Sequence, residues 1–342
     1  MNRFKVSKFR HTEARPPRRE DKQLRIFDPR AKPEASQSTW AHENSRDGRL
    51  VWTGTQEHLV STGFNKMCER EVKLWDARLF SSARTSLTLD TSPRSLMPLL
   101  DPDSRLLVLA GKGESQLYCY EVAPQQPALS PVTQCLLESV LQGVALVPRR
   151  ALAVMGCEVL RVLQLSDTAI VPISYHVPRK AVEFHEDLFP DTAGCVPASN
   201  PHAWWAGSNQ QVGPSSRVRG TWSSCALTQL PGEGFSSPPS LLTSPSTPSS
   251  LGPSLSSTSG ISTSTSQRSL QSLLGPSSKF RHAQGTVLHR DSHITNLKGL
   301  NLTTPGESDG FCANQQRVAM PLLSSGGQVA VLEMKAVRHR EA

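Results

Sequence analysis

The sequence predicts an all-β protein in which short antiparallel strands are repeated as similar sheets. Apolar, β-branched runs recur between clusters of Gly, Pro and Asp, about every 8 to 12 residues, and this pattern favours strands over helices. Residues 24–28 and 72–76 each end in an aromatic side chain followed by Asp, and the two aspartates are 48 positions apart. A strand that ends in this way at intervals of roughly 40 to 45 residues is typical of a propeller blade.

The expected strands follow from these apolar runs in chain order. Each run is bounded by turn residues, and each is too short for a stable helix. The expected strands are 24–27, 50–52, 58–62, 71–75, 87–90, 97–101, 106–110, 116–121, 135–137, 143–147, 151–155, 159–165 and 170–175, followed near the C-terminus by 318–323 and 329–334.

A pentapeptide, Ser-Lys-Phe-Arg-His, occurs twice, at residues 7–11 and 278–282. Two copies of one start signal indicate an architecture that is built twice. Two further motifs lie between the copies. Residues 111–114 read Gly-Lys-Gly-Glu before the aromatic strand of Tyr118 and Tyr120, and residues 182–192 form an acidic segment around Phe189-Pro190.

Taken in this order, the motifs resemble those of the tandem, two-propeller coronins, over roughly residues 1–205 and 277–334. The resemblance implies a WD-type propeller that acts as a scaffold without enzymatic activity. It also implies roles in actin organisation and in Golgi-related membrane traffic, and therefore a cytoplasmic location with Golgi and vesicular association.

The sequence departs from that family in length. A ring of seven blades at roughly 40 residues each needs about 280 residues, whereas residues 21–205 supply 185. The fold expected is therefore an incomplete WD40-type β-propeller with antiparallel blades. The expected divisions are a basic strand and tail (1–20), a partial propeller (21–205), an irregular segment (206–234), a disordered linker (235–277) and the truncated start of a second propeller (278–342).

The net charge of +8 is concentrated near the N-terminus, where residues 3–34 hold eleven Lys/Arg and five Asp/Glu. Such a segment could bind an acidic filament or anionic lipid, although a solvated chain end is the simpler interpretation. Nucleic acid is not an expected partner, because no binding motif accompanies the charge. By analogy with the family, the candidate contacts for actin or another acidic partner are Lys8, Arg10, Arg15, Arg18, Arg19 and Lys298.

The linker has the composition of a chain that stays disordered. Residues 236–278 contain 23 Ser/Thr in 43 positions, so they bury too little apolar surface to offset the entropy of ordering. Three Ser/Thr-Pro pairs are candidate phosphorylation sites, and a passive spacer is the alternative. The candidate positions are Ser237, Ser244 and Thr247.

No chemistry of catalysis is expected. The seven cysteines are scattered without Cys-x-x-Cys spacing, which argues against disulfides, a metal site or a cofactor. Residues 111–114 lack the P-loop spacing, and the histidines have no nucleophile or carboxylate at a recognisable spacing. No apolar run is long enough to span a membrane.

The sequence therefore predicts a non-enzymatic, coronin-like scaffold. Its expected partners are actin filaments, bound weakly, and other proteins that contact the propeller faces. Self-association through open sheet edges is also expected. Two alternatives stay open: a protein-binding propeller remnant without actin binding, and an unstable truncated fragment without function.

Overall fold

The computed structural model describes fourteen ranges of the chain: residues 5–7, 22–28, 30, 36–54, 57–123, 125–180, 183–193, 197–210, 212–215, 217–218, 221–222, 278–302, 310–324 and 326–334. All of them belong to one compact unit, which comprises Met1–Ser223 and Ser278–Ala342. The expected linker at 235–277 lies outside the described residues.

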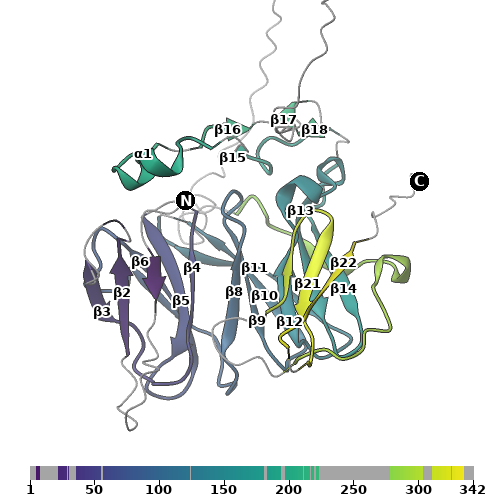
Figure 1. Ribbon diagram of the computed structural model, residues 1–342, viewed down its shortest axis with the longest axis horizontal. Helices are drawn as coiled ribbons and strands as arrows, with labels where there is room; N and C mark the ends of the chain where they lie inside the picture. The colour runs from purple at the N-terminus through teal and green to yellow at the C-terminus, as the bar shows by residue number, and fades with distance from the viewer. Residues whose placement is uncertain are drawn as a thin grey trace, which may run out of the picture. The chain divides into compact units, whose positions relative to one another are not determined.

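Five antiparallel sheets make up most of the described unit (Figure 1). The first contains β1 (Lys5–Ser7), β2 (Gln23–Phe27) and β3 (Gln37–Trp40). The second contains β4 (Arg49–Trp52), β5 (His58–Phe64), β6 (Arg70–Asp76) and β7 (Thr85–Thr88). The third contains β8 (Leu96–Leu100), β9 (Leu106–Gly111), β10 (Gln116–Val122) and β11 (Leu129–Leu136).

The fourth and fifth sheets bring in the C-terminal part of the chain. The fourth has the order β12 (Gly143–Leu146), β13 (Glu158–Leu165), β14 (Ile170–His176), β19 (Gln284–Val287). The fifth contains β20 (Cys312–Ala313), β21 (Arg317–Pro321) and β22 (Val329–Glu333). The segment that the sequence analysis assigned to a second propeller thus supplies the fourth strand of the fourth sheet.

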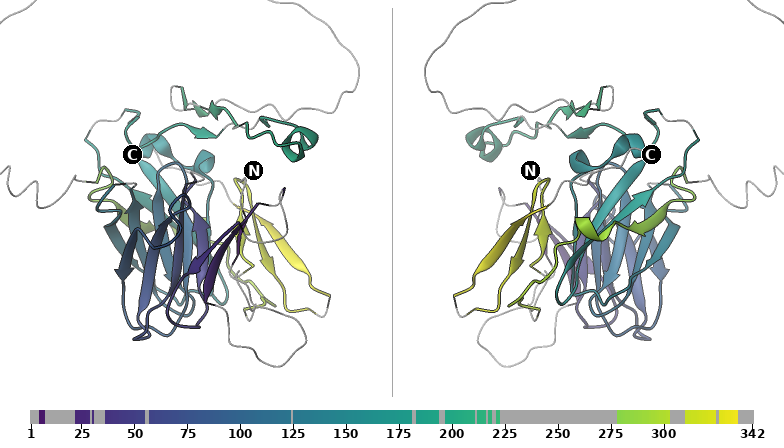
Figure 2. Two further views of the ribbon diagram at one scale, coloured as in Figure 1. Left: turned by 90° about the vertical axis from the view of Figure 1, so that its left-hand side faces the viewer. Right: turned by 90° about the vertical axis from the view of Figure 1, so that its right-hand side faces the viewer.

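The apolar core lies between the faces of neighbouring sheets. One cluster joins the first and second sheets through Leu24, Leu59 and Trp75, and another joins the second and third. The largest cluster spans the third, fourth and fifth sheets. Figure 2 shows the strands of these sheets from two further sides. Every residue of β5, β9 and β13 is buried, as expected for strands covered on both faces. This stacking of antiparallel sheets confirms the predicted all-β, incomplete WD40-type propeller.

Most expected strands coincide with observed ones within one or two residues, but the strand predicted at 151–155 is wrong. That stretch forms two 3-10 turns, Arg149–Ala151 and Val154–Gly156, and Cys157 follows with a φ of 55°. Leu152 and Val154 are nevertheless buried, so the apolar pattern reflected core packing in a turn. The strands β3 and β19 were missed because their sequences, QSTW and QGTV, contain no apolar run.

A short segment follows the fourth sheet and includes the helix α1 (Pro201–Trp205). The Asn200 side chain caps it by accepting a hydrogen bond from the Ala203 backbone N–H at 2.7 Å. Arg30 holds the helix: its guanidinium donates to the Trp204 carbonyl at 3.1 Å and lies 5.0 Å from that indole ring. The strands in the described residues of the expected irregular stretch are two residues long. They are β16 (Pro214–Ser215), β17 (Arg217–Val218) and β18 (Thr221–Trp222), and β16 pairs with β15 (Thr192–Ala193).

A 3-10 turn, Arg290–Ser292, follows β19. Among the described residues, no helix is long and apolar enough to cross a bilayer.

Candidate functional site

Of the sequence-predicted contacts, the structure describes only Lys298. Lys8, Arg10, Arg15, Arg18 and Arg19 lie outside the described residues, as do Ser237, Ser244 and Thr247. Lys298 lies exposed on the connection between β19 and β20. Its backbone position is fixed on both sides, because Leu297 N–H donates to the Thr168 carbonyl at 2.9 Å and Leu300 bridges to Leu322.

Lys298 is part of a basic segment, which we define as residues 278–302. The segment holds four Lys/Arg and one Asp, a net charge of +3. Arg281, Arg290 and Lys298 are exposed, and none of the three forms an ion pair with a described residue. Exposed and uncompensated cations attract acidic surfaces, so this segment is the candidate interaction surface of the described unit.

Two of the family motifs meet where the basic segment begins. Phe280 of the second Ser-Lys-Phe-Arg-His copy is fully buried and packs in the same cluster as Leu188 and Phe189 of the acidic Phe-Pro segment. Lys279 Nζ donates a hydrogen bond to the Asp187 carbonyl at 2.8 Å. These two motifs, whose contacting residues Asp187 and Lys279 are 92 positions apart in the sequence, are therefore the two halves of one contact.

Arg149 fastens the acidic Phe-Pro segment from the other side. Its guanidinium donates to the Leu188 carbonyl at 2.9 Å, lies 5.5 Å from the Phe189 ring, and reaches Asp101 at 3.3 Å. Burial lowers the pKa of Arg149, and the charges of Asp101 and Asp103 oppose that shift. A buried guanidinium with a carboxylate partner and a carbonyl acceptor is a fixed structural contact.

The third motif, the Gly-Lys-Gly-Glu turn, also reaches the basic segment. Lys112 Nζ donates a hydrogen bond to the Leu302 carbonyl. Glu114 accepts two hydrogen bonds from Arg70 of β6, at 2.9 and 3.0 Å, and thereby joins the third sheet to the second. A Cβ on Gly111 would lie 2.2 Å from the Glu114 carboxylate, which explains why glycine begins this turn.

Arg70 binds a second carboxylate, Asp90, while Tyr118 donates to the same carboxylate at 3.1 Å. Burial alone would raise the pKa of Asp90, but the hydrogen bond and charge of Arg70 outweigh it and lower that pKa. The Arg70 side chain is only 2% exposed. This cluster is thus a buried ion-pair network that fixes the relative position of two sheets, and it was not foreseen from the sequence.

His42, on the connection between β3 and β4, has the connectivity of a catalytic triad with Ser61 of β5 and Glu71 of β6. His42 Nδ1 lies 2.7 Å from Glu71, and His42 Nε2 lies 2.9 Å from the Ser61 hydroxyl. The Ser61 oxygen also accepts a hydrogen bond from the Trp75 indole at 2.8 Å, and Ser61 is 2% exposed. A nucleophile needs access to substrate, so this arrangement is a structural network.

The same network stabilises the charged form of Glu71 within the sheet. Burial would raise the pKa of Glu71, but hydrogen bonds from His42 and Lys73 outweigh it and lower that pKa. Gly63 leaves the room that the imidazole needs, because a Cβ there would lie 2.4 Å from the His42 ring. Sequence reasoning found no partner for His42, since 29 positions separate it from Glu71.

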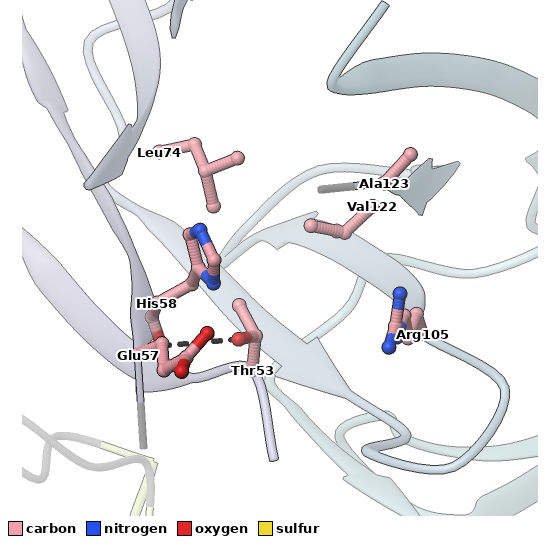
Figure 3. A pocket seen from close by; sticks show the side chains of 7 residues that line it. All are labelled: Thr53, Glu57, His58, Leu74, Arg105, Val122 and Ala123. Atoms are coloured by element: carbon pink, nitrogen blue, oxygen red, sulfur yellow. Dashed lines mark hydrogen bonds between the residues drawn. The ribbon is translucent and has the colours of Figure 1, made fainter. Parts of the chain in front are cut away.

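A cavity of about 240 Å³ opens between the second and third sheets (Figure 3). Figure 3 shows Thr53, Glu57 and His58 on one side and Arg105 on the other. Burial lowers the pKa of His58, and the nearby Asp76 carboxylate opposes that shift. The Arg105 guanidinium forms no hydrogen bond or ion pair with a described residue.

The described cysteines and acidic residues show no sign of metal or redox chemistry. Five cysteines in the described ranges are free thiols, and burial raises the pKa of Cys119 to about 12. Within those ranges, no three His, Cys, Asp or Glu side chains gather as metal ligands would. Cys119, Cys135 and Cys157 are buried and pack as small apolar side chains, whereas Cys68 is half-buried and Cys312 is exposed.

The fold and its motif contacts define a class, the WD-type propellers, which work as non-enzymatic scaffolds by presenting faces and edges to other proteins. Residues 170–212 match a type of WD40 repeat, and residues 275–339 match a domain of unknown function, DUF1899. The crystal structure of the WD40 domain from Toxoplasma gondii coronin is similar, with a TM-score of 0.54 and 28% identity over 58% of this chain and 51% of that chain.

The chain is similar to coronins over 92% of its length, in agreement with the motif resemblance. It is 83% identical to Coronin-7 of Bos taurus over 331 residues, 77% identical to Coronin-7 of Homo sapiens over 340, and 75% identical to that of Mus musculus over 338. Each alignment covers 92% of this chain, and the chain spans 36 to 37% of the length of these relatives.

Proposed function

We propose that this protein is a scaffold that takes part in actin organisation and in Golgi-related membrane traffic, at a cytoplasmic site. The observation that supports the proposal most is the exposed basic segment, with a net charge of +3. It coincides with the match to DUF1899 at residues 275–339. Because the surface of an actin filament is acidic, exposed cations along one segment of a folded scaffold are suited to steer the encounter.

The strength of that contact is limited by the exposure of the groups. Each exposed charge pair contributes on the order of 1 kcal/mol or less, and the screening length at physiological salt is about 8 Å. Lysine at position 298 presents a point charge without the planar fork of arginine. Binding to filaments is therefore expected to be weak and sensitive to salt.

Co-sedimentation of the purified chain with actin filaments, at low and at physiological salt, tests this proposal. The triple variant Arg281→Ala, Arg290→Ala, Lys298→Ala should pellet several-fold less than the wild type at low salt. A control that removes three exposed polar groups of the same segment without charge, Gln284→Ala, Thr286→Ala, Asn296→Ala, should pellet like the wild type. Tight binding that persists at physiological salt in the triple variant would show that the contact lies elsewhere.

A protein-binding propeller without actin affinity is the second candidate function. The cavity in Figure 3 favours it, because the Arg105 guanidinium, which forms no hydrogen bond or ion pair with a described residue, lines a space that a carboxylate side chain of a partner could enter. A cooperative thermal melt combined with no filament binding at low salt would favour this candidate. A chain without a cooperative melt would instead support the unstable-fragment alternative.

A further inference from the structure

The start of the basic segment has the properties of a bound peptide. We define residues 278–288 as the closing peptide. It reaches the fourth sheet only after residues 223–277, so a long connection separates it from the strands that it completes. The fourth sheet therefore acquires its outer strand from a segment that is remote in the sequence, and that strand occupies a site formed by other parts of the chain.

The acceptor site has three parts. The edge of β14 pairs with β19 over four residues, from Ile173–Val287 to His176–Gln284. The apolar pocket beside Leu188 buries Phe280 completely. The Asp187 carbonyl accepts from Lys279 at 2.8 Å, and the Pro172 carbonyl accepts from the Leu288 N–H at 2.9 Å.

The chain carries a second segment that matches the closing peptide. Residues 7–11 repeat Ser-Lys-Phe-Arg-His without a change, so they offer the same lysine for Asp187 and the same phenylalanine for the pocket. We propose that the acceptor site is a peptide-binding site for a Ser-Lys-Phe-Arg-His segment followed by an extended strand, and that the two copies compete for it.

The site favours the second copy for reasons of space and hydrogen bonding. A Cβ on Gly285 would lie 2.9 Å from the Tyr175 ring and 3.2 Å from the Cys135 Cβ, between two sheets. The first copy has Ala14 at the equivalent position. It also has Pro17 in the place of Leu288, and proline has no N–H for the Pro172 carbonyl.

A labelled synthetic peptide of residues 277–289 tests the site by fluorescence anisotropy. The full chain with Phe280→Ala should bind it at least tenfold more tightly than the wild-type chain, because the wild-type site is already occupied by its own copy. The same peptide with its phenylalanine replaced by alanine should not bind. A Phe280→Ala chain that melts cooperatively yet does not bind the peptide would overturn the proposal.

A second measurement keeps the proposal testable if that variant does not fold. In the wild-type chain, excess unlabelled peptide should increase hydrogen exchange in β19 while the amides of β14 remain protected. No change in β19 at saturating peptide would also overturn the proposal, because a competing strand must displace the resident one.

The selection between copies is tested with a first-copy peptide, residues 6–18. It should bind the Phe280→Ala chain at least tenfold more weakly than the 277–289 peptide does. The peptide with Ala14→Gly and Pro17→Leu should regain most of that affinity. Equal binding of the two unmodified peptides, or no recovery, would show that Gly285 and Leu288 do not select the second copy.

Discussion

At the residue scale, hydrogen bonds of single polar side chains hold neighbouring groups in positions that apolar packing alone does not define. Ser61 illustrates the point, since its hydroxyl joins an imidazole and an indole in the interior of the second sheet. The connectivity of Ser61, His42 and Glu71 is that of a hydrolase, but the burial of all three side chains assigns them to stability. Geometry without access does not define an active site.

The carboxylate that ends β6 gives a prediction about acid. The hydrogen bond from Arg78 lowers the pKa of Asp76 to about 2, and burial opposes it only in part. A depressed folded-state pKa means that the contribution of Asp76 to stability is present above its ordinary value of 3.8 and is lost as the pH falls toward about 2. Asp76→Asn should therefore flatten the decline of the unfolding free energy between those two pH values.

Urea unfolding at a series of acidic pH values measures this effect. The control is Asp291→Asn, whose side chain is 91% exposed, and its unfolding curve should parallel that of the wild type. An Asp76→Asn curve that also parallels the wild type would mean that the hydrogen bond from Arg78 does not stabilise the folded state.

At the element scale, neighbouring sheets are joined by turns that leave no space for an extra atom. Gly111 is such a position, because its hydrogen faces both the Glu114 carboxylate and the Arg70 guanidinium. Gly111→Ala should displace that ion pair and destabilise the chain by about 1 to 3 kcal/mol. Thermal unfolding should show a lower midpoint.

Gly156→Ala provides the matched control, since a Cβ there meets nothing within 4 Å. It should leave the midpoint nearly unchanged. If the two alanine variants melt alike, the close approach at Gly111 does not hold the second and third sheets together.

The element scale also shows why strands such as β3 and β19 were absent from the expected strands. β3 and β19 are outer strands, and their residues are mostly exposed or half-buried. Because an outer strand buries little side-chain area, its apolar pattern is weak, and its position is set by the backbone of the neighbour. Such a strand is recognised only by its pairing with the neighbouring strand, which is β2 for β3 and β14 for β19.

At the scale of the whole molecule, the fifth sheet leaves an edge open. Among the described strands, β22 pairs only with β21, and Val329 and Val331 on it are 58% and 59% exposed. An apolar strand with a free edge is a template for pairing with another chain. We therefore predict concentration-dependent self-association through β22, which Val331→Lys should weaken several-fold in sedimentation velocity.

The control for this prediction is Leu79→Lys, which removes an apolar side chain that is even more exposed, at 73%, and lies outside the strands. It should associate like the wild type. Loss of association in both variants would point to general hydrophobic attraction, and a wild-type chain that stays monomeric at high concentration would contradict the open-edge interpretation.

The sequence by itself determined the all-β class, the blade-like repeat and the family resemblance. These properties depend on local patterns: short β-branched runs, turn residues between them, and motifs whose residues are contiguous. It also identified Lys298 as a candidate contact, and the structure finds that residue exposed. In the same way, residues 24–27 and 159–165 were predicted as strands because apolar side chains make up most of each run.

Only the tertiary structure decided which remote segments meet. It pairs β19 with β14, buries Phe280 beside Leu188, and joins Arg70 to Glu114 across two sheets. None of these contacts can be predicted from a local pattern in the sequence. Each forms between chain segments that are remote in the sequence and that together bury surface that neither segment buries alone. The sequence shows two identical copies of the Ser-Lys-Phe-Arg-His motif. The packing around Gly285 provides a physical reason why the second copy, and not the first, completes the fourth sheet.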